Sequence, residues 1–310
     1  MILGLHHVTA TVADAQEDLD FCLGALGLRL VKKTVNFDNR NVYHFYYGDE
    51  RGAPGTIWTT FPYAGMGVPV GTSGAGQVTT TSLSVPAGSL GFWRARLVER
   101  GLRAEPAGPR FGEESLAVHD PSGLHFELVA TTRDPRAPWL GAGLDPASAV
   151  RGLHGVTLTV ADAEPTVRLM TELLDFRVVG EAEGRIRVGA GGDRPGHTMD
   201  IVHGTGAGAA RNGLGTVHHV AMAVDSPEAQ RALRETLLAR GARVTEVLDR
   251  QYFQSIYFRE PGGVLFEVAT TAPGFTVDEP LDRLGQGLKL PPWEEPGRAA
   301  IEAGLPAIKS

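Results

Sequence analysis

The chain contains Gly4-Leu5-His6-His7-Val8-Thr9 and, 148 residues later, Gly152-Leu153-His154-Gly155-Val156-Thr157. The two stretches differ only at their fourth position, where the first has His7 and the second has Gly155. A third stretch, Val217-His218-His219-Val220, has the paired histidines again. All three have the β-branched and apolar character of short strands. A chain that repeats one strand but keeps both imidazoles in only some copies indicates a duplicated fold with one working site.

Each copy of this strand opens a segment with the same predicted order of elements. In the first segment, Asp14 is the predicted N-cap of a helix with Glu17 at its third position, and Gly27 is suited to end it. Short strands are then expected at 28–35, 42–48 and 56–61. The same order starts again at 77–85, 153–160 and 216–224, with helices that end near residues 101, 175 and 241. The pattern predicts an α+β protein made of four βαβββ modules.

The spacing of the repeats predicts how the modules are grouped. Modules one and three are 148 residues apart, and Glu127 and Glu267 place modules two and four 140 residues apart. We therefore expect two similar domains, 1–135 and 150–272, which a Pro- and Gly-rich linker joins. The remaining segment, 273–310, is rich in proline and is expected to form an extended tail.

Composition excludes several classes of function. The 310-residue chain has a formal net charge of −7 and no dense basic patch, which argues against a nucleic-acid partner. Cys22 is the single cysteine, so neither a disulfide framework nor a cysteine zinc site is expected. No apolar run approaches the ~18 residues of a membrane span, and no signal-peptide pattern is found. These features predict a cytoplasmic protein, and they leave a homo-oligomer open.

Glu267 is the first candidate for chemistry. It lies in a strand between Phe266 and Val268, where burying a carboxylate is costly unless a cation or hydrogen bonds compensate. His219 lies in the first strand of the same module, and His7 lies in the matching strand of module one. A structural hydrogen bond would account for His219 and Glu267 alone. Two imidazoles and a carboxylate together are the ligand set of non-haem iron sites that keep open coordination positions.

The neighbouring histidines, His6 and His218, would face the opposite side of regular strands. A strand end or a bulge would bring them to the site as supporting or substrate-contacting groups. Otherwise they would be hydrogen-bonded histidines between sheet and helix.

The other copies lack this ligand set. Module two has Thr80 where module four has His219, and module three has Gly155 where module one has His7. Glu127 is retained, so the second site is predicted to be defunct and Glu127 to be dispensable for activity. Alignment of the last strands places Thr60 where a fourth ligand would stand.

With these motifs, the chain resembles the vicinal oxygen chelate superfamily, which includes glyoxalases, bleomycin resistance proteins and extradiol dioxygenases. Within it, the chain is most similar to the hydroquinone-type ring-cleaving dioxygenases. The resemblance extends over nearly the whole chain and is most specific at 5–9, 217–220, 250–258, 261–267, 274–279 and 290–293. It implies paired modules that form half-barrels. It also implies Fe(II), or in some members Mn(II), bound by His7, His219 and Glu267 in the half-barrel of modules one and four.

The resemblance further implies a small aromatic substrate and O₂ as reactants. The family's pocket residues carry over to His6, Thr9, His218, Arg250 and Tyr257, all five as substrate contacts and all but Thr9 as catalytic groups. The alternatives are a catechol extradiol dioxygenase, a glyoxalase-like metal isomerase or lyase, and a metal-free protein that binds small molecules. A glyoxalase-like enzyme would need a fourth ligand, and a metal-free protein would not need the His7, His219 and Glu267 set.

Overall fold

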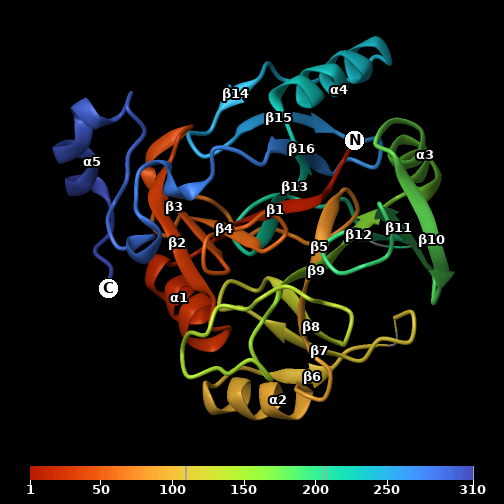
Figure 1. Cartoon of the computed structure of the whole chain (residues 1–310), viewed down its shortest axis with the longest axis horizontal. Helices are drawn as coiled ribbons and strands as arrows, with labels where there is room; N and C mark the ends of the chain where they lie inside the picture. The colour runs from red at the N-terminus through yellow and green to blue at the C-terminus, as the bar shows by residue number, and fades with distance from the viewer. Residues whose placement is uncertain (109, 205, 207, 310) are drawn as a thin grey trace.

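The computed structural model describes residues 1–108, 110–204, 206 and 208–309, and it contains the four expected modules (Figure 1). Module one consists of β1 (Gly4–Val12), α1 (Ala15–Leu19), the π-helical η1 (Asp20–Ala25), β2 (Arg29–Asn36), β3 (Asn39–Gly48) and β4 (Ile57–Pro62). Module two consists of β5 (Gln77–Pro86), α2 (Leu90–Glu99), β6 (Ala104–Pro106), β7 (Ser115–His119) and β8 (His125–Thr131).

The second half of the chain repeats this order. Module three consists of β9 (Gly152–Val160), α3 (Ala163–Leu173), β10 (Phe176–Ala182), β11 (Arg185–Ala190) and β12 (Thr198–His203). Module four consists of β13 (Thr216–Val224), α4 (Pro227–Ala239), β14 (Leu248–Asp249), β15 (Gln254–Arg259) and β16 (Leu265–Thr270). The tail contains the short helices η2 (Phe275–Val277), η3 (Leu281–Arg283), η4 (Glu295–Gly297) and α5 (Arg298–Gly304). The prediction of an α+β fold made of βαβββ modules is confirmed.

Local sequence signals account for the start and the end of the first helix. The Asp14 carboxylate accepts hydrogen bonds from the backbone N–H groups of Gln16 and Glu17. Gly27 ends the helical segment with a φ of 69°, a conformation that favours glycine. The structure differs from the expected regular helix in between, because residues 20–25 widen into a π-helix and the N–H of Leu26 bonds to the Phe21 carbonyl.

The strands form two eight-stranded sheets, each built from two modules. The first has the order β14-β15-β16-β13-β1-β4-β3-β2 and combines modules one and four, as expected for the half-barrel that would hold a metal. The second has the order β10-β11-β12-β9-β5-β8-β7-β6 and combines modules two and three. Each sheet therefore takes strands from both halves of the sequence. The division into sequential domains at 1–135 and 150–272 with a tail from 273 remains a prediction.

An antiparallel pair lies at the centre of each sheet, β1 with β13 in the first and β5 with β9 in the second. The apolar faces of both sheets belong to one buried core. Within it Phe126 of the second sheet contacts Trp58 of the first, with ring centroids 4.8 Å apart. Burial of such aromatic side chains is a main source of stability.

A buried lysine attaches the tail to the first sheet. The ammonium group of Lys32 on β2 is fully buried and lies 2.5 Å from carboxylate oxygens of both Asp278 and Glu279. Tyr252 donates a hydrogen bond to Asp278 at 3.1 Å. The tail then continues to α5, beside β2 and β3 (Figure 1).

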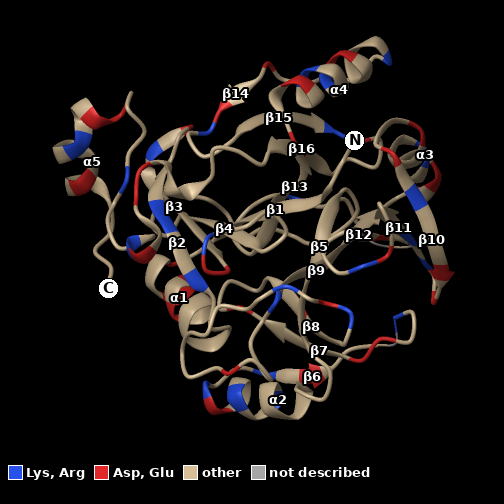
Figure 2. Cartoon of the chain, in the orientation of Figure 1, with Lys and Arg blue, Asp and Glu red and all other residues tan. Residues whose placement is uncertain are grey.

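Figure 2 shows basic and acidic residues interspersed along α2, α4 and α5. Among the helices that the structure describes, none has both the length and the apolar character needed to cross a membrane. The cytoplasmic location remains a prediction from the sequence.

Candidate metal centre

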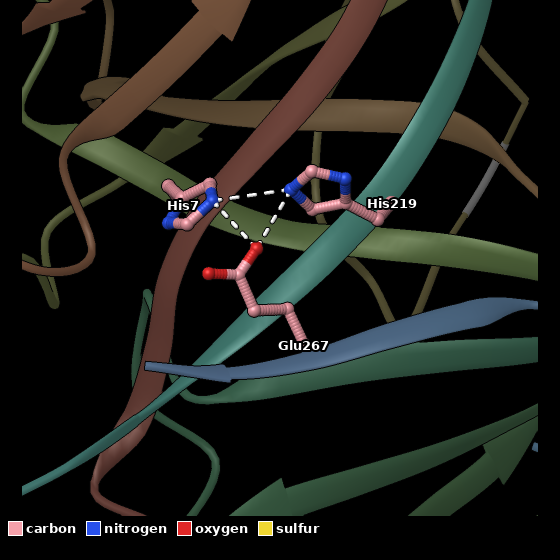
Figure 3. A group of neighbouring side chains, drawn as sticks. All are labelled: His7, His219 and Glu267. Carbon is pink, nitrogen blue, oxygen red and sulfur yellow. Dashed lines mark hydrogen bonds and ion pairs between the residues drawn. The ribbon is translucent and has the colours of Figure 1, made fainter. Parts of the chain in front are cut away.

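Three strands of the first sheet place His7, His219 and Glu267 together. His7 lies on β1, His219 on the adjacent β13, and Glu267 on β16, which pairs with the other edge of β13. Figure 3 shows both imidazole rings and the carboxylate directed at one point. All three side chains are buried, and Glu267 is completely inaccessible to solvent. A carboxylate in such a place requires a compensating partner.

The distances within the triad fit a metal ion. His7 Nε2 lies 3.3 Å from His219 Nε2, and Glu267 Oε2 lies 3.2 Å from the former and 2.8 Å from the latter. Ligands about 2.1 Å from a metal and at right angles to one another are about 3 Å apart. The three atoms therefore have the spacing of three such ligands, and this group could hold a metal ion.

The contacts around the triad favour free lone pairs at its centre. The Nδ1 atoms of His7 and His6 are 2.9 Å apart, and those of His219 and His218 are 2.8 Å apart. When His7 and His219 each donate the Nδ1 proton to the neighbouring histidine, the Nε2 lone pairs of His7 and His219 are left free for a metal. Ser255 donates a hydrogen bond to Glu267 Oε1, which leaves Oε2 for the centre.

Burial and neighbouring groups set the charge states of these residues. Burial lowers the pKa of His219 below its usual value, which keeps the ring neutral and able to ligate. Burial alone would raise the pKa of Glu267, but His7 and His219 hold it well below its usual value. Two neutral imidazoles and one ionised carboxylate are the donor set that a divalent ion requires.

Two β-bulges bring His6 and His218 to the triad, which is the alternative that the sequence left open for irregular strands. Between β1 and β13 the register shifts from Leu5–Met222 to His7–Ala221, so His6 is an extra residue on β1. A second shift, from Thr9–His219 to Ala10–Val217, makes His218 an extra residue on β13. A bulge changes the direction of the side chains next to it, so His6 contacts His7 and His218 contacts His219.

A cavity of about 390 Å³ opens at the triad. Its wall includes three of the residues that the family resemblance implied, His218, Arg250 and Tyr257. The Arg250 Nε donates to the Tyr257 hydroxyl at 3.2 Å, and its guanidinium pairs with Asp38 at 3.1 Å. The aromatic part of the wall comprises Phe37, His44, Tyr46, Phe61, Tyr63 and Phe253. Such a lining suits a planar aromatic ligand.

The other two implied residues, His6 and Thr9, lie behind this wall. His6 packs edge-on against Phe253 with ring centroids 4.9 Å apart, and Thr9 accepts a hydrogen bond from Thr59 at 3.0 Å. Any effect of these two residues on a ligand would therefore pass through a neighbour. Their assignment as substrate contacts remains a prediction.

Comparison with known proteins places the chain in a family. The model of the Glyoxalase/Bleomycin resistance protein/Dioxygenase superfamily matches residues 152–268. A Bacillus subtilis protein named "Putative ring-cleaving dioxygenase MhqE" is 42% identical over 306 residues, which are 98% of this chain and 99% of the relative. The chlorohydroquinone/hydroquinone 1,2-dioxygenase of Sphingobium indicum is 36% identical over 300 residues, 94% of this chain and 92% of the relative. The chain belongs to the glyoxalase/bleomycin resistance/dioxygenase superfamily.

Solved structures of the superfamily have the same fold. A Bacillus subtilis structure that is 40% identical matches with a TM-score of 0.94, covering 99% of this chain and 98% of the other. Maize glyoxalase I, at 15% identity, matches with a TM-score of 0.65 over 86% of this chain and 92% of its own. The second match concerns the fold alone.

The strand register identifies the residue of module one that stands where a fourth metal ligand would be. Glu267 pairs with Ala221 on the strand of His219, and Thr59 pairs with Thr9 on the strand of His7. Ala221 and Thr9 each lie two residues after the ligand histidine of their strand, so Thr59 is the structural counterpart of Glu267. Thr60 was the wrong choice, because alternation directs it to the other side of the sheet, where its hydroxyl bonds to Asp18 at 2.5 Å.

In the second half-barrel, arginine side chains bind the carboxylates at the corresponding positions. Glu127 on β8 forms a buried ion pair with Arg110, whose Nη1 also donates to Ser82 at 2.9 Å. By register, Asp200 stands at the second acidic position, and Arg187 binds it at 2.7 Å. The sequence indicated one carboxylate here, but the structure has two, both neutralised by guanidinium groups. Arg110 gave no sequence signal because it lies between β6 and β7, and Asp200 gave none because β12 lacks the Phe-Glu pair that β8 and β16 share.

Proposed function

We propose that this chain is a metal-dependent ring-cleaving dioxygenase that acts on a small aromatic diol, most favourably a hydroquinone, and that its metal is Fe(II). The observation that carries the proposal is the buried His7, His219 and Glu267 triad at the end of a cavity with an aromatic wall. A relative named as a chlorohydroquinone/hydroquinone 1,2-dioxygenase supports it, because the match extends over nearly all of both chains.

Two histidines and one carboxylate are the donor set of non-haem Fe(II) oxygenases, which favours iron over the alternative, Mn(II). When bound, the metal would bring O₂ and the ionised substrate oxygen together and pass electrons between them. In the overall reaction, one ring C–C bond and the O–O bond break, and both oxygen atoms end in the ring-opened product. The reaction needs no other reductant.

The residues of the wall would hold the substrate and its protons. When His219 ligates the metal through Nε2 and donates its Nδ1 proton to His218, the proton of His218 is on Nε2, which can donate into the cavity. Burial raises the pKa of Tyr257, so its hydroxyl stays protonated and can donate to a substrate oxygen. Arg250, which contacts that hydroxyl, would orient it. His6 and Thr9 would support the triad and the wall from behind.

The rival functions fit less well. A four-ligand glyoxalase-like site would need an acidic group at Thr59, where the hydroxyl instead bonds to His44 and Thr9. A metal-free binding protein would not need two imidazole nitrogens converging on a buried carboxylate. A catechol extradiol dioxygenase would use the same ligands and differs only in how the two hydroxyls are held.

Oxygen uptake tests the proposal. After anaerobic loading with Fe(II), the protein is expected to consume one O₂ per molecule of hydroquinone, faster than with catechol, as measured with an oxygen electrode and by product absorbance. Parallel loading with Mn(II) tests the metal. Consumption no greater than that of metal-free protein with every diol would refute the proposed function, and a preference for catechol would favour the extradiol alternative.

A further inference from the structure

We infer that His44 is a specificity-determining residue that binds the second hydroxyl of a para-diol, the one that does not face the metal. This inference rests on the proposed function for the orientation of the substrate. His44 lies on β3, is buried, and lines the same cavity as the triad. It is outside the repeated histidine motifs, so sequence repetition did not indicate it.

Hydrogen bonds fix the position of the proton on His44. Its Nε2 lies 2.8 Å from the hydroxyl of Thr59, and that hydroxyl donates its own proton to Thr9 at 3.0 Å. Thr59 must therefore accept from His44, which places the ring proton on Nε2. Nδ1 is left as an acceptor with no protein partner among the described residues. Thr59, which stands where a fourth metal ligand would be, thus orients His44.

Two aromatic neighbours hold the ring in place. The His44 centroid is 4.0 Å from that of Tyr46 and 4.3 Å from that of Phe61. Burial, followed by the nearby His7 and His219, keeps the pKa of His44 well below its usual value. The ring is therefore a neutral acceptor held in one orientation.

The sheet places His44 at a suitable distance from the triad. Only β4 separates β3 from β1, which carries His7. The backbones of β3 and β1 are therefore two strand spacings apart, about 10 Å in total. The two oxygens of a para-diol lie at opposite ends of the ring, so this substrate suits contact groups on strands that are not adjacent. A catechol, whose hydroxyls are adjacent, could not contact both the metal and His44.

The other acidic, amide and imidazole acceptors of the wall already have partners. Asp38 is paired with Arg250, and the side-chain oxygen of Asn36 accepts the backbone N–H of Asp38. His218 Nδ1 contacts His219. Within this group of acceptors, His44 Nδ1 is thus the one without a hydrogen-bond partner among the described residues.

Ligand binding under anaerobic conditions tests this without depending on turnover. Calorimetry on the metal-loaded protein would compare hydroquinone with 4-fluorophenol, which has the same shape but no second hydroxyl proton. The parent is expected to prefer hydroquinone about tenfold, the effect of one well-formed hydrogen bond. His44→Phe, which keeps the aromatic packing, should bind both ligands equally. His44→Gln should retain part of the preference through its amide oxygen.

Tyr43→Phe is the matched control, because Tyr43 lies on the same strand as His44 but does not line the cavity, so the loss of its hydroxyl should leave the preference unchanged. Metal content and thermal unfolding of each variant exclude a loss through misfolding. A parental preference in His44→Phe, or no preference in the parent, would overturn the inference. Failure of the proposed function is seen separately, as an absence of oxygen uptake by the parent.

Discussion

Replacement of Glu267 by glutamine is expected to reduce metal retention to background while the chain stays folded. The amide has nearly the same shape and can still accept the hydrogen bond from Ser255, but it removes the one negative charge of the triad. His219→Ala should have the same effect by removing one of the two nitrogens. Atomic emission measures the metal that each chain retains after desalting, and far-UV circular dichroism shows whether the chain stays folded.

Glu127→Gln is the control for this experiment, because Glu127 is the counterpart of Glu267 in the second sheet. It should retain the parental metal content, since its partner is Arg110. Metal loss in Glu127→Gln with full retention in Glu267→Gln would move the site to the other half-barrel.

Glu127→Ala is expected to lower the free energy of unfolding by about 3 kcal/mol, because it leaves the buried guanidinium of Arg110 without its carboxylate. Per folded molecule, metal content and activity should remain parental. The sequence predicted that Glu127 is dispensable for activity, and the structure adds a cost in stability. Urea denaturation monitored by fluorescence measures the difference.

A double variant, Arg110→Met with Glu127→Leu, separates the ion pair from the packing around it. Removing both charges should recover most of the lost stability, because neither is left buried alone. If the free energy of unfolding of Glu127→Ala is less than about 1 kcal/mol below that of the parent, the expectation is wrong. Asp200, which lies 4.0 Å from Arg110, would then be sufficient to stabilise the buried guanidinium.

The sequence predicted the module order and the three converging residues because both depend on short-range patterns and on repetition. Asp14, Gly27 and the repeated strands determine local structure, and His7, His219 and Glu267 lie at repeated positions. The pairing of modules one and four was implied by the family resemblance, and these are the modules that carry the paired histidines.

The features that escaped prediction depend on register and on distant contacts. The sequence left open whether bulges occur at His6 and His218, because they form only when β1 pairs with β13, and the Thr59 position follows from the pairing of β4 with β1. His44 is one histidine in an aromatic strand, which alone suggests packing. The roles of the wall residues, the identity of the metal and a homo-oligomeric state remain predictions.

Oxygen consumption by the Fe(II)-loaded parent and by Glu267→Gln, each with hydroquinone, tests the central claim most directly. The parent should consume one O₂ per hydroquinone and release a ring-opened product, whereas Glu267→Gln should show no consumption above the metal-free background. Consumption by Glu267→Gln at the parental rate would contradict the assignment of the active site to this triad.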